Sequence, residues 1–568
     1  MKRILLFSLL LIFSSYLFAQ TELALNSESS INAQIEADRA GGSPADVYTV
    51  ASGGFYYWDA TLQVDFDLHI KGESSDWIYN QASPPILVPI PDGAGVIYTF
   101  VDVIEGGSLT IENCLFSGKN STEGGDILGG FFIEHGATQV IIDNCSFSDM
   151  SGNVIETDGA PDLVSITNCL MINCFRPTNS PWGGHLGRFN TPAAETIIEN
   201  NTFVNHGRLL GNGGNFYTSD LIENHNTSLN CQTNAQNLHW KQALMANNIF
   251  YNWSWLGRTP ADVAYNYSIT TFETYAGLAL DSVSVYWGRN LLYRDPAIKA
   301  YYESEDSLAA KGVSEYITWN TDVDTTILMD DNFTIGKSYW DIDPEFTTGP
   351  GNLDQILAWL SYKYDPSVTD YADWSITSPV SYDDQGQPVV NWPPAFDLSY
   401  SNEYMKVGAT DGLPMGDLNW FPDAKATYLA NRDANIAALV DSITNATALH
   451  IPFDSLSERI TIDDLVSVES NVTNIPNKYY LSNNYPNPFN PSTSIRFGLP
   501  EQSEVTLSIF NILGQKVYEE TVKNLAAGEH LFKFNASQLS SGVYIYSINA
   551  TGVNGKNFVS SKKMMLLK

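Results

Sequence analysis

The middle of the chain holds basic side chains that could act on an acidic sugar polymer. Arg188, Arg208 and Lys241 lie in this region, and His206 stands beside Arg208. In β-elimination from a uronic acid, one basic group takes the proton beside the carboxylate while a cation neutralises the developing charge. We therefore predict Arg208, Lys241 and Arg188 as catalytic residues of a lyase, with His206 as an alternative acid or base.

Tryptophans accompany these basic residues. The face of a Trp ring suits a sugar ring, and Arg suits the carboxylate of a uronic acid. The predicted substrate-binding residues are Trp182, Trp240, Trp253, Trp255 and Arg258.

Two other functions stay open. A hydrolase needs two carboxylates beside the scissile bond, and Glu134, Asp158, Glu195 and Asp220 are available, although their spacing fixes no two of them as a pair. A noncatalytic adhesin or a structural solenoid needs neither arrangement. These alternatives predict different products from the same polysaccharide, or no product at all.

No metal or other cofactor is predicted. Calcium prefers six or more oxygen ligands, so the Asp330–Asp331 and Asp383–Asp384 pairs indicate calcium only weakly. The five cysteines include no CxxC pair, which argues against a zinc ribbon. Their odd number leaves at least one thiol unpaired.

The charge of the chain restricts its partners. With 29 Lys and Arg against 64 Asp and Glu, the formal net charge is −35. Such a surface repels nucleic acid and anionic membranes. We therefore exclude both as partners and expect a monomer that binds polysaccharide.

A repeated motif must position these side chains. An aliphatic residue, a polar residue and Asn recur together, and an aromatic or aliphatic residue follows. The copies span residues 111–116, 142–147, 166–171, 198–203, 222–225 and 245–250, with looser copies at 289–292 and 331–334. Successive asparagines in the six clear copies are 23 to 32 residues apart, which is typical of a solenoid.

Each copy reads as a strand followed by a corner. Ile, Phe and Thr favour strands, and Asn tolerates the left-handed backbone that a corner requires. Stacked coils place equivalent residues about 4.8 Å apart. The sequence therefore predicts an amide ladder of Asn113, Asn144, Asn168, Asn200, Asn224 and Asn247.

The same repeat predicts three further stacks. One is an inward stack of Ile111, Ile142, Ile166, Ile198 and Ile222. Another contains Phe116, Phe147, Met171, Phe203 and Phe250. Cys114, Cys145 and Cys169 share one position, where we expect free, packed thiols.

These coils resemble the pectate-lyase-like right-handed parallel β-helix superfamily over residues 44–345. The resemblance implies an all-β fold, with a right-handed solenoid whose long surface suits extended polymers. The Asp-rich signatures of polygalacturonases and the clustered aspartate calcium site of typical pectate lyases are absent, which weakens the prediction of an enzyme. A β-sandwich or propeller is the alternative fold, but neither needs Asn at a recurring corner.

The rest of the chain predicts export. Met1-Lys2-Arg3, the apolar residues 4–11 and Phe18-Ala19-Gln20 indicate a signal peptide over 1–19 and a mature form that does not span a membrane. We expect the β-helix with its N-terminal cap over 20–345 and a capping region with short helices over 346–465. A linker over 466–478 follows.

Residues 479–568 predict a small antiparallel β-sandwich. The turn-rich run 484–493 precedes alternating strands at 494–497, 505–510 and 541–546 and the tail 562–568. This segment resembles the type A C-terminal sorting domain of the type IX secretion system. The resemblance implies that the secretion machinery is a partner and that the protein passes through the periplasm and is secreted or held on the outer cell surface.

Overall fold

The computed structural model describes residues 20–567 except 93, 95, 120–130, 176–183, 213–217, 233–235, 239, 257–267, 273–283, 305–316, 320–332, 336–337, 366, 371, 446–458, 461–477, 483, 485–486 and 488. The predicted signal peptide lies outside the described residues. The chain divides into two compact units, Met1–Arg459 and Ile460–Lys568.

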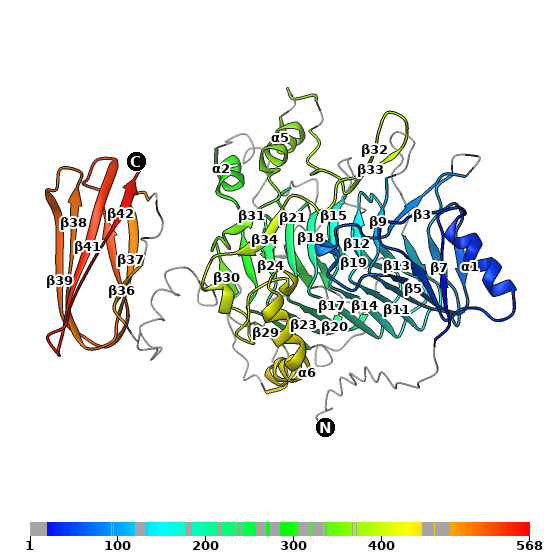
Figure 1. The fold of residues 1–568 in the computed structure, drawn as a ribbon, viewed down its shortest axis with the longest axis horizontal. Helices are drawn as coiled ribbons and strands as arrows, with labels where there is room; N and C mark the ends of the chain where they lie inside the picture. Colours follow the sequence, from blue (N-terminus) through cyan, green and yellow to red (C-terminus); the bar gives the residue numbers. More distant parts are fainter. Residues whose placement is uncertain are drawn as a thin grey trace. The chain divides into compact units, whose positions relative to one another are not determined.

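The first unit is built on three parallel sheets (Figure 1). Sheet A contains β1 (Glu22–Ala24), β2 (Val47–Val50), β5 (Asp67–Gly72), β8 (Ser108–Glu112), β11 (Gln139–Asp143), β14 (Leu163–Thr167), β17 (Glu195–Glu199), β20 (Thr218–Asn224), β23 (Trp240–Ala246), β26 (Ser284–Gly288) and β29 (Phe333–Ile335). Sheet B contains β3 (Phe55–Trp58), β6 (Ile86–Pro89), β9 (Leu115–Ser117), β12 (Ser146–Ser148), β15 (Leu170–Cys174), β18 (Thr202–His206), β21 (Thr227–Cys231), β24 (Ile249–Tyr251), β27 (Leu291–Tyr293), β30 (Ser338–Trp340) and β35 (Arg459–Ile460). Sheet C contains β4 (Leu62–Val64), β7 (Val101–Val103), β10 (Phe132–Glu134), β13 (Ile155–Thr157), β16 (His185–Phe189), β19 (Arg208–Asn212), β22 (Gln236–Leu238), β25 (Ser268–Phe272) and β28 (Ile317–Trp319).

Strands enter the three sheets in rotation along the chain. A strand of sheet A is followed by one of sheet B and one of sheet C, and each pairs in parallel with its equivalent in the next coil. This arrangement is a parallel β-helix, as the repeated motif predicted.

The corner between sheets A and B has a left-handed backbone. Positive φ angles occur at Asn113, Asn144, Asn168, Asn200, His225, Asn247 and Arg289. The corner predicted at Asn224 is found one position later, at His225. The shift arises because β20 pairs Ile198 with Glu223 and not with Ile222. Ile222 accordingly lies outside the predicted inward stack and packs with residues of a covering helix, whereas Glu223 is buried within the coil.

The continuous amide ladder stands one residue after the observed corner residues. Two contacts of the predicted ladder form: Asn144 Nδ2 donates to Asn113 Oδ1 (2.7 Å), and Asn247 Nδ2 donates to Asn224 Oδ1 (2.8 Å). Asn168 Nδ2 donates to Asp143 Oδ1 instead. Each amide of the observed ladder donates to the next side-chain oxygen at 2.9–3.0 Å. Its members are Asn201, Asn226, Asn248 and Asn290.

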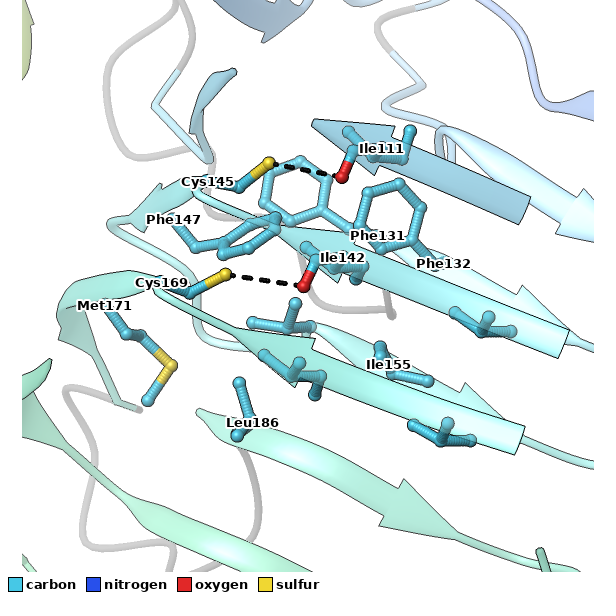
Figure 2. Close-up of a cluster of buried hydrophobic side chains, with 14 of the residues drawn as sticks. Ile111, Phe131, Phe132, Ile142, Cys145, Phe147, Ile155, Cys169, Met171 and Leu186 are labelled. Atoms are coloured by element: carbon cyan, nitrogen blue, oxygen red, sulfur yellow. Dashed lines mark hydrogen bonds between the residues drawn. The ribbon is translucent and has the colours of Figure 1, made fainter. Parts of the chain in front are cut away.

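Cysteines occupy this ladder position in the preceding coils. Cys114, Cys145 and Cys169 are buried, and all five cysteines of the chain are free. The Cys145 thiol donates to the carbonyl of Ile111 (3.7 Å), and the Cys169 thiol to that of Ile142 (3.8 Å; Figure 2). Burial raises the pKa of each thiol in the stack, so the three remain neutral.

Aromatic and aliphatic stacks fill the interior beside the thiols. Phe116 and Phe147 stack with ring centroids 5.3 Å apart. Met171 continues the row beyond Phe147 (Figure 2). Ile111, Ile142 and Ile166 are likewise buried and paired in register. The predicted inward positions are confirmed for these coils.

Residues 346–445 differ from the expectation of a cap over the open end. Their elements are β31 (Phe346–Thr348), α5 (Leu353–Tyr364), β32 (Val380–Tyr382), β33 (Pro388–Val390), β34 (Asp397–Tyr400), the 3-10 helices η4 (Met405–Val407) and η5 (Leu418–Trp420), and α6 (Pro422–Asn445). We call residues 372–421 the strap, because they run along the side of the coils. Ile376 bonds to Asn173, Ser378 to Asp149, and the Trp392 indole to Gln81. These hydrogen bonds hold the strap along the flank of the coils, where a cap over the open end would not lie.

Three other helices cover the solenoid locally. They are α1 (Ile31–Ala40), η1 (Ile78–Asn80) and α2 (Pro296–Ser304). Ile31 and Ile35 of α1 join the core. Within the residues that the structure describes, no α-helix combines the length and apolar character needed to traverse a bilayer.

The second unit is antiparallel, as predicted. One sheet contains β36 (Tyr480–Leu481), β37 (Ser492–Leu499) and β40 (Gly528–Asn535). The other contains β39 (Lys516–Leu525), β38 (Ser503–Asn511), β41 (Gly542–Gly552) and β42 (Asn557–Leu566). Alternate residues of these strands, such as Val505, Leu507 and Ile509, form a core separate from that of the coils.

Candidate functional site

The structure does not bring the predicted catalytic residues together. Arg188 is exposed on sheet C, and Lys241 is exposed on sheet A. Arg208 belongs to sheet C, but its side chain is buried. A shared site for elimination would need all three at one surface.

His206 is an interior residue. Its Nε2 lies 2.6 Å from Ser228 Oγ, and its ring packs beside Phe203 and Trp253. Burial lowers the pKa of His206 to about 3. The ring is therefore neutral and has no access to an external polymer.

Of the predicted substrate-binding residues, two are buried and the side chains of the other three lie outside the described part of the structure. Trp253 and Trp255 are fully buried, and Trp255 packs edge-on against Trp359 and Trp374. Trp182, Arg258 and the side chain of Trp240 lie outside the described part of the structure. Trp253 packs in the core of the coils against Phe250, and Trp255 packs under the strap, so neither ring has an exposed face for a sugar.

A polar cluster on the outer face of sheet C offers a different site. Asp102, Glu156 and Arg188 occupy one register row of β7, β13 and β16. The residues on either side of Asp102 and Glu156 are buried, so these carboxylates point outward. With His135, Asp158 and Asn190, they form what we call the sheet C cluster.

His135 connects two carboxylates of the sheet C cluster. Its Nδ1 lies 2.5 Å from Asp102 Oδ1, and its Nε2 lies 3.3 Å from Asp158 Oδ2. A neutral imidazole has one N–H donor and the imidazolium has two. The ring can therefore donate to both carboxylates only when it is protonated, and about 44% of its side chain is exposed to solvent.

The second half of the cluster surrounds Glu156. Arg188 Nη1 lies 3.5 Å from Glu156 Oε1. Asn190 Nδ2 donates to Glu156 Oε1 and to Asp158 Oδ1, both at 2.8 Å. These contacts fix the carboxylates while leaving lone pairs that can accept hydrogen bonds from hydroxyl groups.

A carboxylate pair on sheet A forms a separate group. Glu195 and Asp220 face each other in register on β17 and β20. Burial raises the pKa of Glu195, and the charge of Asp220 adds to this rise. Burial also raises the pKa of Asp220, although Lys241 opposes the change. Spacing along the chain did not reveal this pair, because only the β-sheet register aligns the two residues.

The described residues contain no cluster suited to a metal ion. No group of three His, Cys, Asp or Glu side chains among the described residues could hold a metal ion. Asp383 accepts hydrogen bonds from the backbone of Gln385 and Gln387 within its own turn. Asp330 and Asp331 lie outside the described residues.

Sequence reasoning missed His135, Asp102 and Glu156. Their signal is weak. Asp102 and Glu156 are each a single polar residue between buried neighbours in a three-residue strand, and His135 directly follows such a strand. Such strands do not carry the Asn motif, so the repeat did not align them. Aligning the sheet C strands with one another would have placed Asp102 and Glu156 in one row.

Comparison with known proteins identifies the second unit. Residues 483–565 match the family model described as "Secretion system C-terminal sorting domain". A comparison with curated proteins gives no match.

Similarity to solved structures is low. Dimeric latent PorU from Porphyromonas gingivalis is 20% identical over 17% of this chain, with a TM-score of 0.14, and the match spans only 10% of PorU. CopC from Methylosinus trichosporium OB3b is 18% identical over 16% of this chain and 93% of its own, with a TM-score of 0.13. An engineered protein is 13% identical over 58% of this chain and 77% of its own, with a TM-score of 0.14.

Fold and sorting domain together define the class of protein. It is a parallel β-helix protein that carries a type IX secretion C-terminal sorting domain. The sorting domain makes the type IX machinery a partner of the chain and directs the protein to the cell surface or to the medium.

Proposed function

We propose that this exported β-helix binds polysaccharide along the outer face of sheet C. The supporting observation is the sheet C cluster, in which carboxylates, an imidazole, an amide and a guanidinium lie on one outward face of successive coils. Adjacent coils are about 4.8 Å apart. An extended polymer lying along the solenoid axis would meet one row of polar groups after another.

The charges of the cluster favour a neutral polymer over a polyuronate. Three carboxylates stand against one guanidinium and one imidazole, and the whole chain is strongly acidic. Sugar hydroxyls can donate to carboxylates, whereas uronate carboxylates would be repelled. This choice departs from the pectin-like substrate that the basic residues suggested.

Hydrolysis is a second candidate, favoured by the same geometry. Asp102 and Glu156 lie two strands apart, which places their backbones roughly 10 Å from each other. Inverting hydrolases separate their carboxyl groups by roughly 6.5–9.5 Å, leaving room for a water molecule. Cleavage would then use one carboxyl as acid and the other as base.

The test is a panel of soluble xylan, glucomannan, hydroxyethylcellulose and polygalacturonate. Retardation of the full chain in gels containing each polymer measures binding, and new reducing ends measure hydrolysis. Glu156→Gln and Asp102→Asn should each weaken binding about tenfold, because a hydrogen bond to a charged group contributes about 1.5–3 kcal/mol.

Glu403→Gln is the matched control, since this exposed carboxylate lies in the strap. It should leave affinity unchanged. Absence of retardation by every polymer would reject polysaccharide binding, and stronger retardation by polygalacturonate would reject the preference for a neutral polymer.

A further inference from the structure

The sorting domain presents a large share of the exposed apolar side chains. Among the described residues, seven of the 13 exposed large hydrophobic side chains belong to residues 479–568, although this segment is less than a fifth of the chain. Single apolar residues scattered over a surface are ordinary, whereas a contiguous group marks a surface that binds a partner. The seven are Ile512, Leu513, Ile545, Val553, Val559, Met565 and Leu567.

Four apolar side chains lie together on the outward face of the sheet that contains β38, β41 and β42. Phe510 pairs in register with Ile545, and Val543 pairs with Met565. Tyr544, which separates Val543 from Ile545, is buried in the core, so its two neighbours point outward. Ile545 is 44% exposed and Met565 37%. Because adjacent strands are about 4.8 Å apart, the four side chains form one continuous surface.

The turn after β38 presents two further apolar side chains. Ile512 is 75% exposed and Leu513 is 77% exposed. Asn511 holds this turn, since its Oδ1 accepts from the backbone N–H of Leu513 and from that of Gln515, both at 3.0 Å. The two side chains are therefore held outward by a hydrogen-bonded turn. The apolar patch, as we call it, contains Phe510, Ile512, Leu513, Val543, Ile545 and Met565.

The outward face becomes polar farther along the same strands. Ser561 Oγ donates to Ser547 Oγ (2.9 Å), and the next row pairs Val559 with Asn549. Val559 is 62% exposed, but its partner across the sheet is an amide. The apolar side chains are thus concentrated at one end of the face, and Val559 at the other end is an isolated one.

The charge of the sorting domain differs from that of the whole chain. Residues 479–568 contain eight Lys and Arg against five Asp and Glu, although the full chain has a formal net charge of −35. Lys563 is exposed and lies in the same register row as Phe510 and Ile545. A complementary protein surface would be apolar at its centre and acidic at its rim.

We propose that the apolar patch docks the sorting domain on an apolar, acidic-rimmed surface of a protein of the type IX machinery. The family match makes this machinery a partner of the domain, and the apolar patch is the part that it contacts. Burial of the exposed side chains supplies affinity, and Lys563 supplies orientation.

The charges favour a protein over an anionic membrane. Membrane-binding segments carry clusters of about four to eight Lys and Arg. Beside the apolar patch, the sheet offers Lys563 and Lys516, and Lys516 is already paired with Glu519. The docking proposal does not depend on polysaccharide binding by the coils.

Export of full-length variants from a bacterium with a type IX system tests the docking surface. Ile545→Thr keeps a β-branched residue in the strand but removes apolar surface. Ile545→Thr and Leu513→Ser should each lower the exported amount about fivefold, with matching accumulation in the periplasm. Lys563→Glu should lower export as well, whereas Lys563→Arg should not. A photo-crosslinking amino acid in place of Ile545 should link the chain to a type IX component identified by mass spectrometry.

Val559→Thr is the matched control, because it makes the same kind of change on the same face at the polar end. It should be exported as the wild type is, and thermal unfolding should show that every variant is folded. Wild-type export of Ile545→Thr would overturn the proposal, as would an equal loss in Val559→Thr.

Two further measurements distinguish other occupants of the apolar patch. If sedimentation shows a dimer that Ile545→Thr dissociates without changing export, the patch joins two copies of the chain and the proposal is rejected. Binding to lipopolysaccharide vesicles that Ile545→Thr abolishes, without a crosslink to a type IX component, would reject it in favour of a lipid surface.

Discussion

Asp417 is a buried carboxyl group that joins the strap to sheet B. Its Oδ2 accepts from Thr202 Oγ1 (2.8 Å), and its Oδ1 accepts from the backbone N–H of Asn419 (2.8 Å). Burial raises the pKa of Asp417 to about 7, and these hydrogen bonds and the charge of Lys425 only partly oppose it. The folded protein therefore holds this proton at pH values where the unfolded chain has lost it.

Stability should consequently fall as pH rises from about 4 to about 7. In this window the native state binds more protons at Asp417 than the unfolded state, so each increase in pH favours unfolding. Asp417→Asn removes the titrating group. We expect the variant to gain stability relative to wild type across this window, by roughly 2–4 kcal/mol at pH 8.

Urea unfolding at pH 4, 5, 6, 7 and 8 measures the effect. Asp423→Asn, an exposed change at the start of α6, is the control and should show no such trend. A difference between Asp417→Asn and wild type that does not change with pH would contradict the prediction.

Single residues also show why the corners were predictable. Asn at a repeated position predicted the left-handed backbone, and five of the six predicted corners were placed correctly: Asn113, Asn144, Asn168, Asn200 and Asn247. His225 was missed because the preceding Asn224 fits the Asn motif, although His is also enriched among residues with positive φ. The φ angle, and not the residue type, defines the position.

A second set of corner residues, four asparagines and one aspartate, also has a regular position in the sequence. Asp149, Asn173, Asn205, Asn230 and Asn252 each follow a corner residue by five positions and have positive φ. Asn230 Nδ2 donates to Asn205 Oδ1 (2.9 Å), and Asn252 Nδ2 to Asn230 Oδ1 (3.0 Å). Counting from the first corner to the next Asn would have predicted this second ladder.

Helix α6 covers part of sheet A through one apolar stripe. Ile436 and Leu439 pack with Ile222 and Leu244, and Arg432 lies 2.6 Å from Glu199. Leu429, on the same helix, is 58% exposed. The helix thus offers a buried position and an exposed control.

Ile436→Ala should lower the free energy of unfolding of the coil unit by about 2–4 kcal/mol, because it removes buried methyl groups and leaves a cavity. Leu429→Ala should change it by less than about 0.5 kcal/mol. Urea unfolding monitored by far-ultraviolet circular dichroism measures both. Equal effects of the two substitutions would show that α6 does not pack on sheet A as described.

Some elements of the coil unit could be predicted from the sequence, and others could not. Strands of sheets A and B carry the repeated motif, so their alternation and order were predictable. The strap was not, because its partners lie far away in sequence and its own residues show no repeat. The carboxylates of sheet C and the Glu195–Asp220 pair depend on register between coils of unequal length, which the sequence does not specify.

The two units of the molecule have separate cores and separate roles. The sorting domain at 483–565 directs export, and its hydrophobic core is distinct from that of the coils. Deletion of residues 479–568 should therefore trap the protein in the periplasm while leaving the β-helix folded.

Cell fractionation in a bacterium with a type IX system tests this expectation, with circular dichroism of the purified truncation as the check on folding. Full-length Glu156→Gln serves as the control and should reach the cell surface or medium as the wild type does. Undiminished surface delivery of the truncated chain would contradict the role of the domain.

The coil unit cannot finish folding until the strap has been synthesised. Asn173 Nδ2 donates to the carbonyl of Ile376, 203 positions later, and Thr202 Oγ1 donates to Asp417, 215 positions later. A ribosome that has finished the middle coils has therefore not yet made the segment that covers them. Contacts of such long sequence separation form slowly. The nascent chain should present an uncovered flank to chaperones until residues 372–421 have been synthesised.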